Sequence, residues 1–219
     1  MMSDSAALPG AMRDHWWWRP GWAVGRTFYT WHITFDNHPD LRRLADFYAP
    51  VLARLPMLDP VPARWLHLTT QGIGFTDEVD RADVEAIVRA TQTRLARLTS
   101  FKVTFGPPTV DAEAIKIEVR PVERLVDLRN SIRHAIADTW GHDRVPEPEE
   151  DWRPHVSLAY SNAAGPAQPI ADALAAHPQQ SAEITIPAVS LIALNRDRRM
   201  YEWNDVANVR LGRAAEDVD

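Results

Sequence analysis

Apolar residues recur along the chain at two spacings, which predict strands and helices in an irregular order. Residues 27–35 are rich in β-branched and aromatic side chains, which is typical of a strand. In residues 40–55 the apolar side chains repeat every three or four positions, which is typical of a helix. The same criteria predict further strands over residues 65–70, 101–105, 114–120, 155–160, 184–194 and 200–203, and further helices over 80–98, 122–140 and a short Ala-rich stretch after 169.

The order of these elements favours one class of fold. Strands follow each other directly at 101–120 and at 184–203, and within 114–120 apolar residues alternate with charged ones, as in a half-buried antiparallel strand. The sequence therefore predicts an α+β fold with mostly antiparallel sheets and flanking helices. We expect Gly106-Pro107-Pro108 to join two strands and Pro187 to mark an edge or a bulge.

The ends of the chain lack periodicity. Residues 1–25 mix small residues, Pro and Trp, so we expect a disordered start and then an irregular Trp-rich arm. Its tryptophans either stack on a base or cap a cleft, or they form a hydrophobic plug, which is the interpretation that we favour. The main domain is expected over 26–205 and a frayed tail over 206–219.

Composition narrows the chemistry. With 219 residues and 45% apolar side chains the chain can bury a sizeable core. It has no cysteine, which excludes disulfides, thiolate metal sites and a cysteine nucleophile. The net charge of −6 disfavours a long polyanionic partner such as duplex nucleic acid. No secretory signal and no membrane span are evident, so we expect a cytoplasmic protein without a membrane partner.

The candidate chemistry lies in two tripeptides, His67-Leu68-Thr69 and His155-Val156-Ser157. Within a strand, residues i and i+2 lie on the same face, so each tripeptide places an imidazole beside a hydroxyl. Two such pairs facing each other suit phosphodiester chemistry. One imidazole takes a proton from the attacking oxygen and the other gives one to the leaving oxygen, while the hydroxyls bond the non-bridging phosphate oxygens.

The tripeptide pattern alone is not specific. A third copy, His32-Ile33-Thr34, lies in the first predicted strand. The other two each follow a predicted helix and a Pro-containing loop, and they lie 88 positions apart, as an internally duplicated unit would place them.

On these motifs, LHLTT at 66–70 and RPHVSLAY at 153–160, the sequence resembles the 2H phosphoesterase superfamily, and within it the LigT-like 2'-5' RNA ligases and RNA 2',3'-cyclic phosphodiesterases. The resemblance implies two pseudo-symmetric lobes around a central cleft, to which each lobe gives one motif. It implies that His67 and His155 are the acid/base pair and that Thr69 and Ser157 bind phosphate. It also implies action on 2',3'-cyclic phosphates or 2',5'-linked ends, with reversible 2',5' joining in some members.

Other residues are weaker candidates. Arg153, Tyr160, Gln71 and His32 lie near the motifs and are candidate substrate contacts. The turn Arg196-Asp197-Arg198-Arg199 either supplies positive charge to the site or is a solvated hairpin tip, which is the interpretation that we favour. The remaining histidines are interpreted as surface residues: His15, His38, His134, His142 and His177.

Three functions stay open at this point. The first is a metal-independent phosphodiesterase with no cofactor, acting on a small nucleotide or an RNA terminus. The second is a catalytically weak module of the same fold that binds nucleotides or RNA ends. The third, a metal-dependent hydrolase, rests only on the eight histidines, and no His-x-His or His-Glu-x-x-His spacing supports a metal site. The sequence leaves the oligomeric state open.

Overall fold

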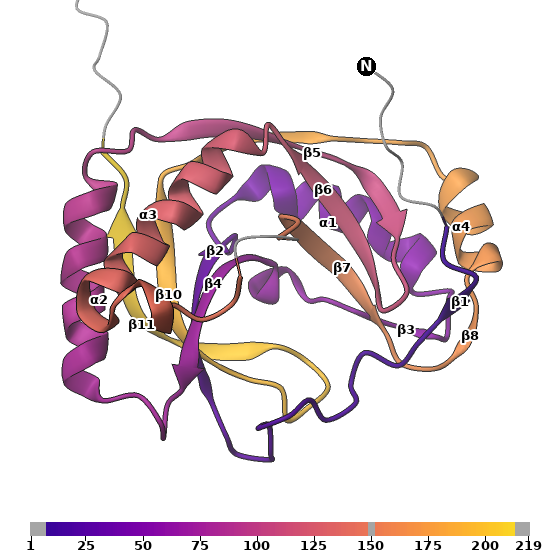
Figure 1. Cartoon of the computed structure of the whole chain (residues 1–219). Helices are drawn as coiled ribbons and strands as arrows, with labels where there is room; N and C mark the ends of the chain where they lie inside the picture. The colour runs from indigo at the N-terminus through magenta and orange to yellow at the C-terminus, as the bar shows by residue number, and fades with distance from the viewer. Residues whose placement is uncertain (1–7, 149–151, 213–219) are drawn as a thin grey trace, which may run out of the picture.

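The computed structural model describes residues 8–148 and 152–212 and places two antiparallel sheets beside each other (Figure 1). One sheet has four strands in the order β11-β10-β2-β4, and the other has five in the order β3-β7-β6-β5-β9. Their bounds are β2 Phe28–Thr34, β3 Leu58–Pro60, β4 His67–Phe75, β5 Phe101–Val110, β6 Ala114–Arg120, β7 His155–Ser161, β9 Ala182–Ile186, β10 Ala188–Asn195 and β11 Glu202–Arg210. The expected α+β fold with mostly antiparallel sheets is confirmed.

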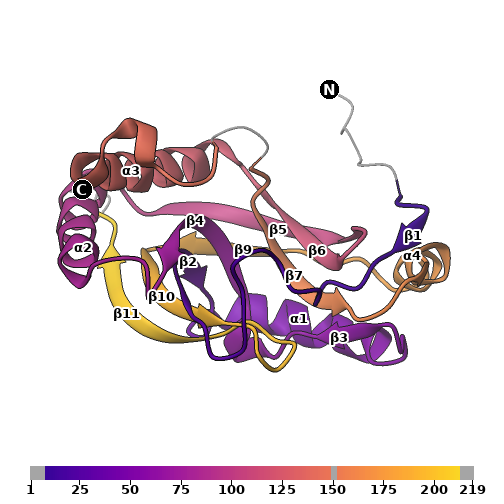
Figure 2. The same cartoon turned by 60° about the horizontal axis from the view of Figure 1, so that its bottom comes forward.

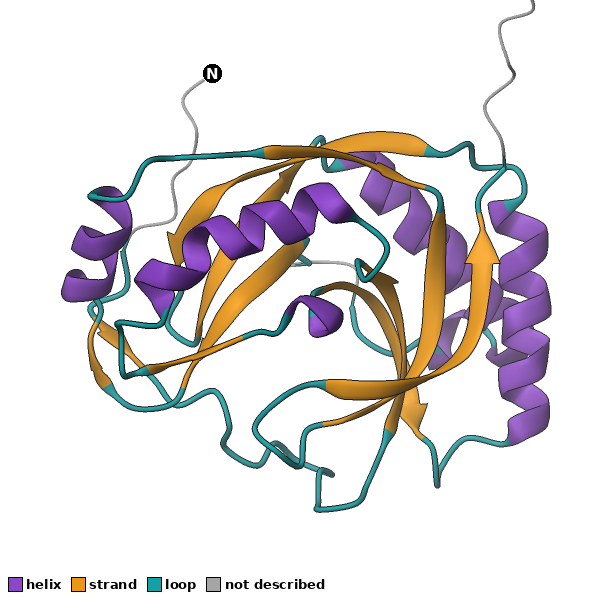
Figure 3. Ribbon diagram, turned by 180° about the vertical axis from the view of Figure 1, so that it is seen from behind, coloured by secondary structure: helices purple, strands orange, loops and turns teal. Residues whose placement is uncertain are grey.

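Helices cover the outer side of each sheet (Figures 2 and 3). Helices α2 (Arg81–Leu95) and α3 (Glu123–Trp140) pack on each other and on the four-stranded sheet, through β11 and β4 respectively. Helix α1 (Pro39–Leu52) contacts β9 and β3, and α4 (Gln168–Ala175) contacts β5, so both lie on the five-stranded sheet. Two 3-10 turns complete the helical segments, η1 Ala63–Trp65 and η2 His142–Arg144.

The helices form where their apolar stripes meet the sheets. In α3 the residues at three- and four-residue steps are buried, as expected for the inner face of an amphipathic helix: Leu125, Leu128, Ile132 and Ile136. The core includes Trp31, Phe35 and Phe105, each at most 1% exposed. None of the helices in the described part of the chain is long and apolar enough to cross a membrane.

Four expectations about the strands need correction. The strand expected at 65–70 begins at His67 and continues to Phe75, and Trp65 belongs to the 3-10 turn η1 instead. The strand expected at 101–105 does not end at Gly106 but continues to Val110, through an irregular register beside β6. The single strand expected at 184–194 is two strands, β9 and β10, in different sheets, and Pro187 is the residue at which the chain passes from one to the other. A proline cannot donate to a strand ladder, so it suits a switch between sheets. The last strand runs on to Arg210, so residues 206–210 are paired rather than part of a tail.

The described part of the N-terminal arm begins at residue 8 and crosses one side of the molecule before it enters β2 (Figure 2). Its short strand β1 (Ala11–Met12) pairs with β8 (Gly165–Pro166). Trp16 is 9% exposed, whereas Trp17 and Trp18 are 51% and 49% exposed. The interpretation as a hydrophobic plug therefore holds for Trp16 and not for Trp17 and Trp18. The start expected to be disordered, and the chain after residue 212, lie outside the described residues.

Candidate functional site

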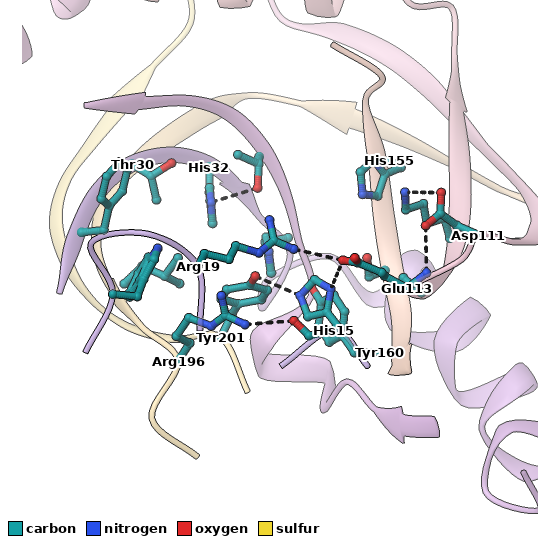
Figure 4. A pocket seen from close by; sticks show the side chains of 18 of the residues that line it. His15, Arg19, Thr30, His32, Asp111, Glu113, His155, Tyr160, Arg196 and Tyr201 are labelled. Carbon is teal, nitrogen blue, oxygen red and sulfur yellow. Dashed lines mark hydrogen bonds and ion pairs between the residues drawn. The ribbon is translucent and has the colours of Figure 1, made fainter. Parts of the chain in front are cut away.

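A cavity of about 400 Å³ opens between the two sheets, and both motif strands line it (Figure 4). His67 and Thr69 reach it from β4, and His155 and Ser157 reach it from β7. Figure 4 shows His32 and His155 on opposite sides of this space. The volume lies within the range of small-ligand sites. The structure thus brings together the two imidazoles and the two hydroxyls of the tripeptides in one cavity.

Each of the two motif imidazoles is held by the same kind of hydrogen bond. His67 Nδ1 lies 2.8 Å from the carbonyl oxygen of Trp65, and His155 Nδ1 lies 2.7 Å from that of Arg153. A carbonyl oxygen only accepts, so Nδ1 carries the proton and donates in both rings. In the neutral imidazole Nε2 is then left with its lone pair. Both rings therefore have Nε2 as the atom that can exchange a proton with a ligand.

A bulge follows each motif at the same place. In β4, Thr69 pairs with His32 and Gln71 pairs with Trp31, so Thr70 is the extra residue. In β7, Ser157 pairs with Lys116 and the next pair is Ala159 with Ile115, so the residue between them is likewise extra. A bulge reverses the alternation of side chains beyond it. The two halves of the site therefore share a backbone feature as well as a residue pattern.

The bulge explains where two candidate contacts lie. Beyond the β7 bulge the alternation is reversed, which places Tyr160 on the face of His155, and Tyr160 lines the cavity. Beyond the β4 bulge the same reversal turns Gln71 away from Thr69. Gln71 is fully buried, does not line the cavity, and bonds the carbonyl oxygen of Pro146 and the side chain of Arg133. The expectation of a substrate contact from Gln71 is therefore corrected.

His32 lies next to His67 within the site. The two rings stack with their centroids 4.5 Å apart and their planes 3° from parallel, and His32 is 1% exposed. His32 Nε2 lies 3.1 Å from the hydroxyl oxygen of Thr69, whose side chain is exposed to the cavity. The Trp203 ring lies nearly perpendicular to both rings, with its centroid 5.9 Å from that of His32 and 5.4 Å from that of His67. His32 is thus a cavity residue that positions a motif hydroxyl, whereas exposed Arg153 does not line the cavity.

Burial sets the charge state of these imidazoles. It lowers the pKa of His67 to about 4, against the opposing effect of the bond to Trp65, and the positive charge of His155 adds to the lowering. Burial and the charge of Lys116 lower the pKa of His155. Burial and His67 lower the pKa of His32 well below its ordinary value. Without a ligand, all three imidazoles are therefore neutral near pH 7.

Sequence reasoning missed one wall of the cavity. His15, Arg19 and Trp22 of the arm line it, together with Arg196 and Tyr201 from the end of the last hairpin (Figure 4). His15 is 7% exposed and Arg196 is 4% exposed, so neither is the surface residue that we expected. The arm shows no periodicity that would predict its path. The cluster of four tryptophans within residues 16–22 was the only signal that it packs against the domain.

His15 is fixed by aromatic and polar contacts. Its ring stacks on Tyr160 with a centroid distance of 4.3 Å, and its Nε2 lies 2.9 Å from the Tyr201 hydroxyl. Burial lowers its pKa to about 3, and nearby Arg19 lowers it further. His15 is therefore neutral and holds the arm against the cavity.

No metal site is evident in the part of the chain that the structure describes, since no three His, Cys, Asp or Glu side chains there come together in a way that could hold an ion. Lys116 faces the site from β6, and its ammonium is 2.8 Å from the carboxylate of Asp111.

Comparison with known proteins gives a family and a fold. A family model described as the 2'-5' RNA ligase superfamily matches residues 53–198. No curated protein matches the sequence.

Among solved structures, TT0787 of Thermus thermophilus aligns with a TM-score of 0.65 at 19% identity, over 86% of this chain and 98% of that one. E. coli LigT complexed with 3'-AMP aligns with a TM-score of 0.58 at 16% identity, over 85% and 98%. The PDE domain of MHV ns2 aligns with a TM-score of 0.55 at 10% identity, over 77% and 99%. At these identities the structures establish a shared fold.

Proposed function

The chain belongs to the 2'-5' RNA ligase superfamily, which confirms the resemblance seen in its motifs, and from this premise we propose that it is a phosphodiesterase that needs no metal ion. Its substrates are 2',3'-cyclic phosphates or 2',5'-linked ends of nucleotides or RNA. The observation that carries the proposal is the matched pair of imidazoles. His67 and His155 both have Nδ1–H bonded to a carbonyl two residues earlier and Nε2 left for a ligand in one cavity.

The reaction needs one imidazole as a base and one as an acid. For a 2',3'-cyclic phosphate, the neutral imidazole takes a proton from water at Nε2 as the water oxygen bonds to phosphorus. The protonated imidazole gives its Nε2 proton to the ribose oxygen as the bond from that oxygen to phosphorus breaks. The product is a phosphate monoester with a free neighbouring hydroxyl. The side from which water approaches decides which of His67 and His155 is the base.

The same two groups account for 2',5' linkages. There the neighbouring 3'-hydroxyl takes the place of water, and the 5'-oxygen of the next nucleotide leaves with the acid's proton, which produces the 2',3'-cyclic phosphate. The reverse step joins a 5'-hydroxyl to a cyclic phosphate. Because cleavage of the 2',5' linkage and its reverse, 2',5' joining, use one transition state, joining needs no residues beyond those of cleavage.

The motif hydroxyls stabilise the phosphate. Thr69 and Ser157 donate to the non-bridging oxygens, whose negative charge builds up in the transition state. When the Thr69 hydroxyl donates to phosphate, its oxygen accepts the hydrogen bond from His32, so His32 carries its proton on Nε2. His32 is therefore a positioning residue and not a proton donor to the substrate.

The lowered pKa values of the site histidines fit an anionic substrate. A bound phosphodiester carries a negative charge, which favours the protonated form of an imidazole beside it and raises its pKa. The bound substrate therefore favours a protonated imidazole in the site, which supplies the one proton that the leaving oxygen needs. A cavity of about 400 Å³ within a chain of net charge −6 suits a small nucleotide or an RNA terminus rather than a long duplex. That E. coli LigT, of the same fold, has been solved with 3'-AMP supports a nucleotide ligand.

A product assay paired with a binding titration tests this function. Wild-type protein is incubated with 2',3'-cyclic AMP, with and without EDTA, and release of 2'- or 3'-AMP is followed while calorimetry measures binding. We expect turnover that EDTA does not change. Saturable binding without turnover would favour the alternative, a nucleotide-binding module. Activity lost with EDTA and restored by a divalent ion would contradict metal independence.

A further inference from the structure

The cavity wall formed by the arm and the last hairpin holds a buried cation that forms no ion pair with a carboxylate among the described residues. Arg196 is 4% exposed, and its Nη2 donates to the carbonyl oxygen of His15 at 2.9 Å. Its Nη1 is buried and has no hydrogen-bond partner, and no carboxylate pairs with it, among residues 8–148 and 152–212. A buried guanidinium that is not ion-paired is costly. Such a group is suited to receive an anion.

Arg196 is held firmly in this position. Its Cζ lies 5.7 Å from the centroids of the Trp16 and Tyr201 rings and 5.9 Å from that of Trp22. These rings attract the guanidinium through their faces. The hydrogen bond from Nη2 to His15 holds one side of the guanidinium, and the Nη1 side has no hydrogen-bond partner among the described residues.

A second guanidinium lies on the same wall. Arg19 donates from Nη2 to Glu113 Oε2 at 3.1 Å, while its buried Nε has no partner among the described residues. Arg196 donates to the backbone of His15, and Arg19 donates to Glu113, whose carboxylate lies 3.3 Å from His15 Nδ1. The two guanidiniums therefore share the same neighbours on one wall of the cavity. Burial lowers the pKa of Arg196 and the charge of Arg19 adds to the lowering, while Tyr201, Glu113 and Asp14 oppose it. An anion between the two cations would reduce their repulsion.

The distance from this wall to the motif histidines is short. The Tyr201 ring centroid is 5.7 Å from Arg196 Cζ and 5.9 Å from the His67 ring centroid. The guanidinium and the imidazole are therefore at most 11.6 Å apart, the sum of these two distances. One nucleotide spans such a length.

We propose that Arg19 and Arg196 form a second anion subsite, which binds a further phosphate group of the nucleotide whose reacting phosphate lies between His67 and His155. The ligand class is a nucleotide with a 5'-phosphate in addition to its 2'- or 3'-phosphate. A guanidinium matches phosphate because two parallel N–H groups can reach two oxygens. The inference rests on the proposed function, since it places the first phosphate at the histidines.

Calorimetry with two product-like nucleotides tests the subsite without requiring turnover. We compare the Kd of 3'-AMP with that of adenosine 3',5'-bisphosphate, for wild type, Arg196→Gln and Arg19→Gln. Hydrogen bonds to charged groups predict that the bisphosphate binds wild type about tenfold to a hundredfold more tightly. We expect this ratio to fall to about threefold or less in Arg196→Gln and to decrease in Arg19→Gln.

Matched variants separate the subsite from general charge effects. Arg198→Gln removes the same charge from the same hairpin, and the Arg198 side chain is 77% exposed and lies outside this cavity, so the ratio should stay as in wild type. Arg196→Lys keeps the charge but loses the fork and should give an intermediate ratio. Thermal melts check folding, and if Arg196→Gln does not fold, Arg19→Gln decides.

The outcomes distinguish this inference from the proposed function. Equal affinity of wild type for the two nucleotides would overturn the second subsite while leaving a nucleotide site at the histidines. Binding of neither nucleotide would overturn both. If Arg198→Gln lowers the ratio of the two Kd values as much as Arg196→Gln does, the effect is one of net charge alone, and the subsite is overturned.

Discussion

At the scale of single residues, the site repeats one arrangement at two places 88 positions apart in the chain. His67 and His155 use the same ring nitrogen to bond a carbonyl two residues earlier. The alternation of side chains in a strand was enough to predict that each histidine lies beside its hydroxyl. It could not predict the tautomer, which depends on a carbonyl outside the strand.

The hydroxyl of Thr69 gives a prediction at this scale. Thr69→Val keeps the shape of the side chain but removes the donor to the phosphate and the partner of His32. Loss of one such donor typically costs about a hundredfold to a thousandfold in kcat. We expect a fall of that order for Thr69→Val with 2',3'-cyclic AMP, and near-normal kcat for Thr69→Ser, measured by steady-state kinetics. If Thr69→Val and Thr69→Ser have the same kcat, the hydroxyl does not contribute to catalysis.

The lowered pKa values of the histidines predict the pH dependence. The active pair holds one proton, and kcat/KM reports the ligand-free protein. Because the pKa of His67 is about 4 and that of His155 is also lowered from 6.5, the pair loses its last proton below neutral pH. We expect kcat/KM to be greatest below pH 6.5 and to fall about tenfold per unit at higher pH. A kcat/KM that rises between pH 6 and 8 would contradict this charge assignment.

At the scale of elements, the two bulges decide which side chains reach the cavity. No signal in the sequence marks an extra residue at Thr70, so the nearness of Gln71 to the motif in sequence could not show that its side chain turns away from the cavity. The structure shows what supports the bulge. Arg129 of α3 donates from Nε to the carbonyl oxygen of Thr70 at 3.0 Å, and Trp152 Nε1 donates to that of Thr69 at 3.1 Å.

Removing the support of the bulge should affect stability and turnover together. Arg129 is 3% exposed, and in Arg129→Met the carbonyl of Thr70 loses its donor. A buried acceptor left without a partner costs about 1–3 kcal/mol. We expect a lower unfolding midpoint in urea and a lower kcat, because Thr69 shifts. Arg124→Met, on the same helix but bonded to Thr99 instead, is the control. Unchanged kcat in Arg129→Met would show that the bulge does not position the site.

At the scale of the whole molecule, the chain passes repeatedly between the two sheets. β2 belongs to the four-stranded sheet, β3 to the five-stranded one and β4 to the first again. The sequence predicted the strands but not this partition, because nothing local tells which sheet a strand joins. The arm was unpredictable for a related reason, since its contacts are with residues distant in sequence, such as those of Trp16 with Tyr160 and Tyr201.

Buried neutral histidines make the stability of the whole fold depend on pH. His15 and His67 have pKa values of about 3 and 4, below the value near 6.5 in an unfolded chain. From pH 6.5 down to those values the unfolded state binds protons that the folded state does not, so the free energy of unfolding falls as pH falls. We expect a loss of roughly 1 kcal/mol from each between pH 7 and 5.5.

Urea unfolding at pH 7 and 5.5 measures this loss, and His15→Gln should reduce it because one of the buried histidines that lose stability on acidification is gone. A free energy of unfolding that is equal or higher at pH 5.5 would contradict the neutral, buried state of these rings. The net charge of −6 could not predict this pH dependence, because it counts every histidine as neutral and does not show which of them are buried.

The central claim is that His67 and His155 act as one acid/base pair, and the kcat of their separate glutamine variants tests it most directly. With 2',3'-cyclic AMP, His67→Gln and His155→Gln should each lower kcat by about a hundredfold to ten-thousandfold, with thermal melts showing folded protein. His134→Gln, at an exposed position outside the cavity, should match wild type. A kcat within a few-fold of wild type in either folded variant would contradict the account.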